Sequence, residues 1–328
     1  MIDRRTLLLG LLAAPLMPPA AAQVRKPRLA ILAAGSATGP QASVWNILFR
    51  EPLAELGWVE GRTIEIVARF AEGALDRMPA LAAELVALNP DVILTHTRNG
   101  AFAAAEATRT IPIVVGAAGE EALIELAGGL ARPKGNVTGL TLVSHEQHAK
   151  VLELLQQAHP TANRIGILVD PLSAGYRDYP TQLTGLLGPL RLELVRVEAQ
   201  DQGGLDAAFA AMATARVDAV FVTADPNFNR PAMDRRINEL ARAQRIPIVA
   251  TFDGVVREGG LLSLGADYQV LIRRAAVYVD KILRGAKLGD LPIERPTAFK
   301  LVVNLKTAKA LGLTMPPSIL LRADEVIE

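Results

Sequence analysis

The chain has 328 residues, of which half are hydrophobic and about a fifth are charged, and its formal net charge is +1. This length and composition allow one large or two medium domains with buried cores, and they exclude disorder and a coiled coil. The charge lacks the basic excess that a nucleic-acid-binding protein needs. Because the chain has no cysteine, it has no disulfide, no cysteine-ligated metal, no thiol nucleophile and no lipoprotein cysteine.

The first 22 residues have the features of an export signal. Two arginines precede an apolar run at residues 7–17, and three small residues that end at Ala22 offer a cleavage site before Gln23. About 11 apolar residues interrupted by a proline are too few to cross ~30 Å of hydrocarbon. Residues 1–22 are therefore predicted to be a removed signal peptide, of the twin-arginine or the ordinary secretory type, which leaves a periplasmic protein with no membrane span.

From residue 27 onward, short β-branched runs alternate with longer segments of helical period. This alternation is typical of βα units around parallel sheets. The first series has predicted strands at 28–33, 63–68, 91–95 and 111–115, with helices at 45–56, 78–88 and 100–108. The second series has predicted strands at 164–169, 192–197, 218–223 and 246–250, with helices at 182–187, 205–215 and 232–243.

The two series have the same order and nearly the same spacing. KPRLAILA in the first corresponds to ANRIGILV in the second, and IPIVVG corresponds to IPIVAT. The fold class is therefore predicted to be α/β, with two Rossmann-like lobes of parallel strands. The segment 135–141 combines a turn with a short strand and would carry the chain from the first lobe to the second.

The tail after Gly265 resembles neither series. It is predicted to contain a helix at 268–283, a strand at 299–303 and a helix at 305–311. Its simplest placement is in the first lobe, which gives a first lobe of residues 27–140 plus 268–328 and a second lobe of residues 141–267. The chain would then cross between the lobes several times, and parallel crossings form a hinge.

Ligands of open parallel sheets bind beyond the carboxyl ends of the strands. Two such lobes that face each other would line one cleft, and hinge closure around a ligand is a common response of this arrangement. The predicted ligand-binding residues are polar or aromatic residues that follow the strands. They are Ser36, Thr38, Thr95, His96, Thr97, Glu120 and Thr141 in the first lobe, and Asp170, Tyr176, Thr223, Asp225, Phe252 and Asp253 in the second.

These side chains suggest roles in binding, each with an ordinary alternative. The glycines and hydroxyls of residues 35–39 could expose N–H groups to a carboxylate, or could form a simple strand-to-helix turn. Asp225 and Asp253 could accept from a ligand ammonium group, or could cap helices. Phe252 and Tyr176 could stack on a ligand, or could belong to the core.

Catalytic and metal motifs are not found. The sequence HEQH at 145–148 places two histidines three apart, whereas HExxH places them four apart, so a solvated helix start is the better interpretation. His96 follows a strand without a nucleophile partner and would more simply hydrogen-bond to a ligand. Since there is also no GxSxG elbow and no spaced carboxylate pair, the protein is predicted not to be an enzyme and to need no cofactor or metal.

Several segments, considered together, resemble one known family. They are GWVEGRTI at 57–64, ARPKGNVTG at 131–139, RAAVYVDKIL at 274–283 and VNLKTAKALGL at 303–313, followed by PPS and ADE. On these motifs the chain resembles the ABC-transporter substrate-binding family related to the tryptophan/tyrosine-binding TrpX proteins, and the resemblance covers essentially the whole mature chain.

The resemblance implies a type I periplasmic-binding-protein-like fold, a partner permease with its ATPase, and amino acids, often aromatic, as ligands. The leading hypothesis is therefore a monomeric, extracytoplasmic solute-binding protein that captures a small molecule by closure of two lobes. Two alternatives stay open: a sensing domain that delivers its ligand to a signalling partner, and a two-lobed transferase.

Overall fold

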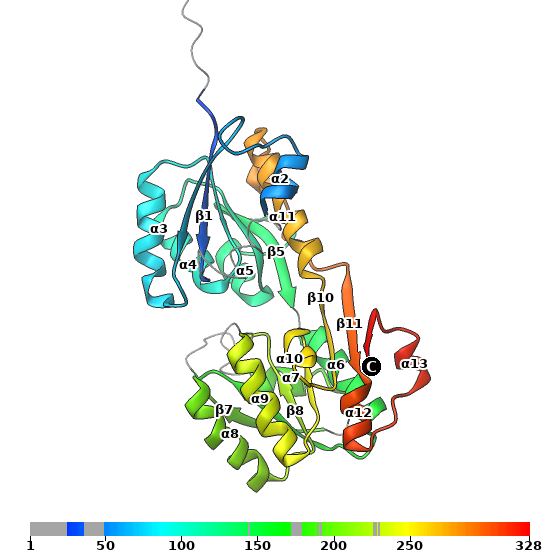
Figure 1. The fold of residues 1–328 in the computed structure, drawn as a ribbon. Helices are drawn as coiled ribbons and strands as arrows, with labels where there is room; N and C mark the ends of the chain where they lie inside the picture. Colours follow the sequence, from blue (N-terminus) through cyan, green and yellow to red (C-terminus); the bar gives the residue numbers. More distant parts are fainter. Residues whose placement is uncertain are drawn as a thin grey trace, which may run out of the picture.

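The chain folds into two α/β lobes, each built on its own sheet (Figure 1). The structure is a computed structural model that describes residues 25–35, 49–143, 145–171, 179–188, 190, 192–225, 228 and 230–328. The predicted signal peptide lies outside these residues. The strand order is β2-β1-β3-β4-β5 in the first sheet and β12-β11-β10-β9-β8-β6-β7 in the second. The predicted α/β class with two lobes is confirmed.

The first sheet is entirely parallel. Its strands are β1 (Arg28–Ala33), β2 (Glu65–Phe70), β3 (Val92–Thr95), β4 (Ile113–Gly119) and β5 (Val137–Val143). Helices α3 (Met78–Ala87), α4 (Arg98–Ala107) and α5 (Glu120–Ala127) cover one face, and α2 (Glu51–Glu55) and α11 (Tyr268–Leu283) cover the other (Figure 1). A short 3-10 helix, η2 (Leu75–Arg77), precedes α3.

Burial on both faces explains the continuous apolar strands of this sheet. Alternate residues of β1 point to opposite faces: Leu29 and Ile31 pack with α2 and α11, whereas Ala30 and Leu32 pack with α3 and α4. The alternation fixes the register of the strand, because a slip by one residue would exchange the two sets.

The second lobe contains five parallel strands, extended at one edge. These strands are β6 (Arg164–Val169), β7 (Glu193–Glu198), β8 (Ala219–Val222), β9 (Ile248–Ala250) and β10 (Leu262–Ala266); β11 (Phe299–Asn304) pairs antiparallel to β10, and β12 (Glu325–Ile327) pairs parallel to β11. One face carries α6 (His145–Ala158), α7 (Tyr179–Thr184), α12 (Leu305–Leu311) and α13 (Pro317–Leu320), and the other carries α8 (Gln202–Ala215), α9 (Pro231–Gln244) and α10 (Gly254–Arg257).

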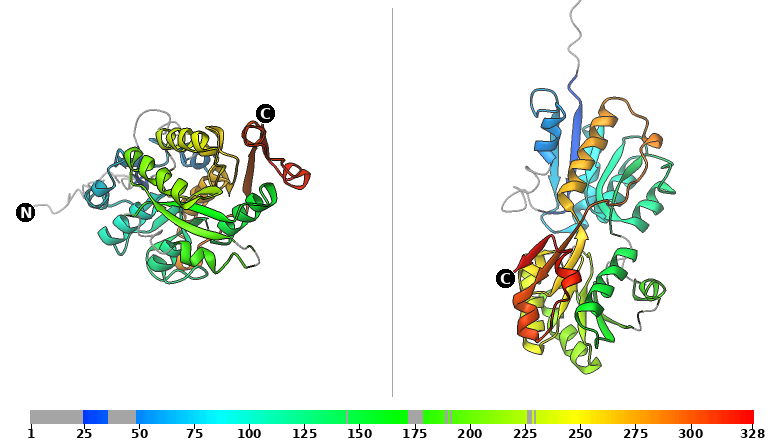
Figure 2. Two further views of the ribbon diagram at one scale, coloured as in Figure 1. Left: turned by 90° about the horizontal axis from the view of Figure 1, so that it is seen from below. Right: turned by 90° about the vertical axis from the view of Figure 1, so that its right-hand side faces the viewer.

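The placement of the tail corrects one prediction. The helix at 268–283 does return to the first lobe as α11, but residues 299–328 belong to the second lobe, where Figure 2 also shows the C-terminus. Leu301 and Val303 of β11 are buried in the core of the second lobe, and Asn304 donates from Nδ2 to the carbonyl of Val256 at 3.1 Å. Addition of β11 also covers an edge of β10 that would otherwise be unpaired.

The carboxyl ends of the two sheets face each other. The chain leaves β10 directly for α11, which packs on β4 and β5 of the first lobe, and β10 runs parallel to β9, β8 and β6. In the other direction, β5 leads into α6 of the second lobe. A third crossing joins the 3-10 helix η4 (Leu288–Asp290) to β11. These three crossings form the predicted hinge, seen between the lobes in Figure 2.

Candidate functional site

The candidate site is the junction where the strand ends of both lobes meet. Ten of the predicted ligand-binding residues lie in the described part of the chain, and all ten are at or just beyond carboxyl ends that face this junction. Thr95 lies at the end of β3 and Thr141 near the end of β5. The others follow a strand: His96 and Thr97 follow β3, Glu120 follows β4, Asp170 follows β6, Thr223 and Asp225 follow β8, and Phe252 and Asp253 follow β9. Ser36, Thr38 and Tyr176 lie outside the described residues.

Three buried threonine hydroxyls at strand ends, those of Thr95, Thr141 and Thr251, have no hydrogen-bond partner among the described residues. Thr141 of β5 is 0% exposed, and Thr251, which follows β9, is 2% exposed. A buried hydroxyl without a partner loses its hydration free energy, so such groups are normally satisfied by water or a ligand. Thr251 directly follows a strand, and this position marks it in the sequence as a candidate beside Phe252 and Asp253.

Two other predicted threonines, Thr97 and Thr223, form hydrogen bonds with the backbone, and a third, Thr95, packs against a helix. The Thr97 hydroxyl accepts from the amide of Gly100 at 3.1 Å and caps α4. The Thr223 hydroxyl donates to the carbonyl of Leu168 at 3.1 Å. Thr95 packs against Gly100 on the face covered by α4, where a side chain at position 100 would collide with it. The hydrogen bonds of Thr97 and Thr223 hold the strand ends in place and account for these two side chains without a ligand, whereas the buried Thr95 hydroxyl has no partner among the described residues.

His96 follows β3 as an uncharged group. Burial lowers the pKa of its imidazole to about 4, because desolvation disfavours the charged form. At neutral pH the ring therefore has one donor and one acceptor nitrogen, and it can serve a polar ligand without adding charge.

Glu120 is already paired with an arginine. Its two carboxylate oxygens accept from Nε and Nη2 of Arg295 at 2.6 and 2.5 Å, and its side chain is only 12% exposed. Arg295 lies on the third crossing, 175 residues away in the sequence. A bidentate arginine pair of this kind uses the carboxylate oxygens that a ligand cation would need.

Asp253 belongs to an ion cluster at the edge of the second lobe. It pairs with Arg257 at 3.0 Å, and Arg257 and Lys300 both pair with Glu325, at 2.6 and 3.0 Å. The hydrogen bonds from Arg257, followed by those from Lys300, lower the pKa of Glu325 to about 2. The cluster links α10 to β11 and β12 and so fastens the end of the chain to the second lobe.

Asp234 is a buried carboxyl group that the sequence analysis missed. It lies in the first turn of α9, is 6% exposed, and its side chain abuts Gly254 of α10. Its Oδ1 has no hydrogen-bond partner in the described part of the chain. Burial, followed by the charges of Glu258 and Asp253, raises its pKa to about 7. The available signal was the helical spacing, since residues 234, 238 and 241 share the buried stripe of α9.

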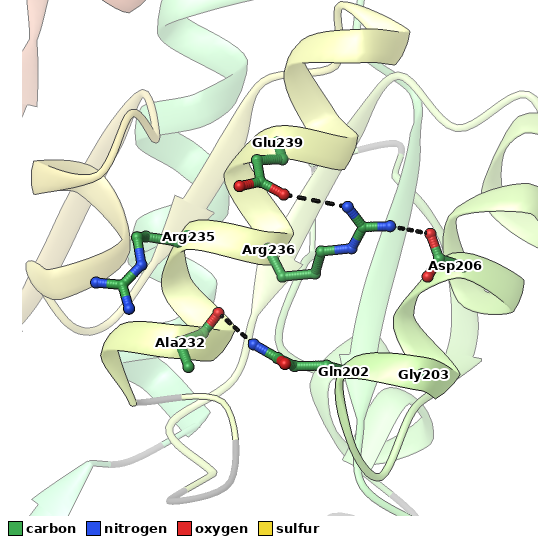
Figure 3. Close-up of a pocket in the computed structure, with 7 residues that line it drawn as sticks. All are labelled: Gln202, Gly203, Asp206, Ala232, Arg235, Arg236 and Glu239. Atoms are coloured by element: carbon green, nitrogen blue, oxygen red, sulfur yellow. Dashed lines mark hydrogen bonds and ion pairs between the residues drawn. The ribbon is translucent and has the colours of Figure 1, made fainter.

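A surface depression lies between the N-terminal parts of α8 and α9 (Figure 3). Arg236 pairs there with Asp206 and Glu239, and Gln202 donates to the carbonyl of Ala232 at 3.0 Å. Because these groups satisfy one another, the depression is a weaker candidate than the junction, where buried hydroxyls lack partners.

The described residues have neither a metal-binding cluster nor a membrane-spanning helix. No group of three or more histidine, aspartate or glutamate side chains is placed there to hold a metal ion. None of the described helices has the length and apolar character that a membrane crossing requires.

Two α/β lobes with facing strand ends and three connecting crossings define the class of hinged ligand-binding proteins. Residues 46–327 match the family described as ABC transporter substrate binding protein, and the chain belongs to this family. The resemblance seen in the sequence is thereby confirmed, as is the type I periplasmic-binding-protein-like fold. Substrate-binding proteins of ABC transporters work outside the cytoplasm, with a small-molecule ligand and a permease partner.

Three relatives illustrate the similarity. A tyrosine-binding protein of Clostridioides difficile is 26% identical over 265 residues, which cover 81% of this chain and 75% of the relative. A conserved domain protein from Vibrio cholerae is 27% identical with a TM-score of 0.82, over 92% of this chain and 100% of the other. An ABC domain from Streptococcus pneumoniae in complex with L-Trp is 24% identical with a TM-score of 0.83, over the same shares of the two chains.

Proposed function

We propose that the protein captures an aromatic amino acid at the junction between its lobes and delivers it to the permease of an ABC transporter driven by an ATPase. The observation that carries the proposal is the meeting of polar strand ends from both lobes, with the buried Thr141 and Thr251 hydroxyls among them. The tyrosine-binding relative and the relative with bound L-Trp support the choice of ligand class.

The side chains at the junction offer partners for the carboxylate, the ammonium group and the ring of an aromatic amino acid. Hydroxyls and the neutral His96 imidazole can hydrogen-bond to a carboxylate, and Asp225, which is 3% exposed just beyond β8, is the candidate partner of the ammonium group. Phe252, half-buried beyond β9, is the candidate stacking surface. Apolar walls with a few placed polar groups are the usual composition of such sites.

In this proposal binding is coupled to closure, and the protein does no chemistry. The two lobes would rotate about the three crossings and enclose the ligand, and the permease would recognise the closed form. The protein would act as a periplasmic monomer after removal of residues 1–22. Recovery of the ligand unchanged, measured by mass spectrometry after prolonged incubation, tests the absence of catalysis.

Calorimetry with amino acids tests the ligand class. We expect saturable binding of L-tyrosine or L-tryptophan with a Kd of about 1 μM or below, which corresponds to about −8 kcal/mol. Tyramine, which lacks the carboxylate, and 3-(4-hydroxyphenyl)propionate, which lacks the ammonium group, should each bind at least about 100-fold more weakly. Buried hydrogen-bonding groups lose their partner in the first case, and the Asp225 carboxylate loses its partner in the second. A folded protein that binds none of the twenty amino acids would contradict the proposal.

The buried hydroxyls of Thr141 and Thr251 give a second test. Thr141→Val and Thr251→Val keep the shape of the side chain, so each should weaken binding of L-tyrosine by about tenfold while the free energy of unfolding stays equal or rises. The matched control is Thr223→Val, whose hydroxyl has a protein partner; it should cost about 1 kcal/mol of stability and change affinity little. If all three variants lose stability and keep affinity, these hydroxyls are structural.

A further inference from the structure

The third crossing is fastened to the first lobe at two consecutive residues. Glu294 accepts from Nε and Nη2 of Arg274 on α11 at 2.7 and 2.6 Å. The next residue, Arg295, donates to both oxygens of Glu120 on α5. Because α11 and α5 cover opposite faces of the first sheet, the crossing is held from both sides.

Backbone hydrogen bonds reinforce the same position. The amide of Thr141 donates to the carbonyl of Glu294 at 2.9 Å, and the amide of Glu294 donates to the carbonyl of Gly139 at 3.0 Å. The third crossing is thereby attached to β5, whose end is the first crossing.

Near the second lobe, the third crossing is attached to the second crossing, which runs from β10 to α11. The amide of Asp267 donates to the carbonyl of Ala298 at 3.0 Å, and the antiparallel pairing of β10 with β11 begins at Ala266 and Phe299. Between the two sets of ties lie Pro296 and Thr297. Proline restricts its own backbone, so a change in the angle between the lobes has few bonds on this crossing to rotate about.

We propose that Glu120 and Arg295 are positioning residues of the hinge: their ion pair confines bending of the third crossing to residues 296–297, and Glu120 influences ligand affinity through this geometry and not by contact with the ligand. The inference rests on the proposed capture by closure. It replaces the ligand contact that the sequence predicted for Glu120.

The electrostatic surroundings fit this role. The hydrogen bonds to Glu120 are the main reason that the pKa of Arg295 is raised, and Glu146 at the start of α6 adds a weaker attraction from the second lobe. Exposed single ion pairs contribute little to stability. This pair has a bidentate geometry and a mostly buried carboxylate, so its removal should loosen the hinge without unfolding the lobe.

A charge exchange distinguishes positioning from ligand contact. Glu120→Gln and Arg295→Gln should each weaken L-tyrosine binding by about three- to tenfold. A looser hinge gives the open form more conformational entropy, and closure around the ligand then loses more of it. The double variant Glu120→Arg with Arg295→Glu should return to within threefold of the unsubstituted protein. If Glu120 instead contacted the ligand, Arg295→Gln would leave affinity unchanged and the exchange would bind at least as weakly as Glu120→Gln; that result would overturn the inference.

A second measurement needs no ligand. Because the chain has no cysteine, spin labels can be placed on Ala83→Cys of α3 and Ala213→Cys of α8, both exposed. The distance distribution between them, from double electron–electron resonance, should broaden in Glu120→Gln and Arg295→Gln and narrow again in the exchange. Arg236→Gln, which breaks an ion pair within the second lobe between α9 and α8, is the control and should not broaden it.

The two proposals can fail separately. If the distance distributions between the spin labels have equal widths in all variants, the positioning role is rejected even if L-tyrosine binds. A protein that binds no amino acid but shows the expected broadening would reject the ligand class and retain the hinge.

Discussion

Replacement of Asp234 by asparagine should stabilise the protein at pH 8. At pH 4 the loss of the ionisable group should contribute little to the free energy of unfolding. The ordinary pKa of this carboxyl group is 3.8, and in the folded protein it is raised to about 7, first by burial and then by Glu258 and Asp253, with Arg235 acting in the opposite direction. An unpaired buried carboxylate is unfavourable, so the folded protein holds the proton that the unfolded chain releases.

The direction in which the free energy of unfolding changes with pH follows from proton linkage. Below pH 3.8 both states are protonated and the group costs nothing. Between about pH 4 and 7 the folded state binds more protons than the unfolded state, so the free energy of unfolding falls as the pH rises, and above pH 7 the loss is constant. A separation of about three between the two pKa values corresponds to about 4 kcal/mol, which is an upper bound for the gain at pH 8.

Urea denaturation at pH 4, 6 and 8 measures this effect. The asparagine amide can itself change stability, but that contribution does not vary with pH, so the difference between pH 8 and pH 4 isolates the ionisation. Asp206→Asn is the matched control on the same lobe, because Asp206 is exposed and paired with Arg236; it should change stability by no more than about 1 kcal/mol at any pH. If the free energies of unfolding of the unsubstituted protein and of Asp234→Asn change in parallel with pH, the Asp234 carboxylate is stabilised in the folded protein and its pKa is not raised.

Replacement of Gly139 by alanine should destabilise the first lobe by about 3–5 kcal/mol. Gly139 has a φ of +148°, and a Cβ atom there would lie 2.7 and 2.8 Å from the backbone N and C of Val115, with the carbonyl oxygen closer still. Val115 is the partner of Gly139 across the β4–β5 pair, next to a shift in register. The alanine must therefore separate two paired strands, and the Gly139 carbonyl that binds Glu294 would move with them.

Gly135→Ala separates the two causes of this loss. Gly135 also has a positive φ, +125°, but a Cβ atom there would meet nothing within 4 Å. It should cost only the conformational strain, about 1–3 kcal/mol. Thermal and urea unfolding of both variants give the comparison, and L-tyrosine affinity should fall further in Gly139→Ala. Equal losses in the two variants would mean that the close approach of β4 and β5 does not limit this position.

The arrangement of strands was largely predictable from the sequence. All eight strands of the two predicted series are present in the described chain, as is the short strand expected within 135–141, because a strand buried on both faces needs a continuous apolar run and is bounded by turns. The repeated order of these runs indicated two lobes. The same rule placed the candidate ligand residues at carboxyl ends of strands, which is a consequence of parallel topology alone.

The sheet that receives the tail was decided only by tertiary structure. The apolar run FKLVVN of β11 could extend either sheet, since local pattern does not specify a partner. The exposed edge of β10 and the core beneath Leu301 and Val303 selected the second lobe. The roles of charged residues depended on partners just as distant: Glu120 is held by Arg295, and Asp234 is buried by the packing of α10 on α9. The sequence by itself thus determined the strands, the two lobes and the edges that meet, because these follow from local periodicity, whereas long-range packing decided which polar groups at those edges are already occupied.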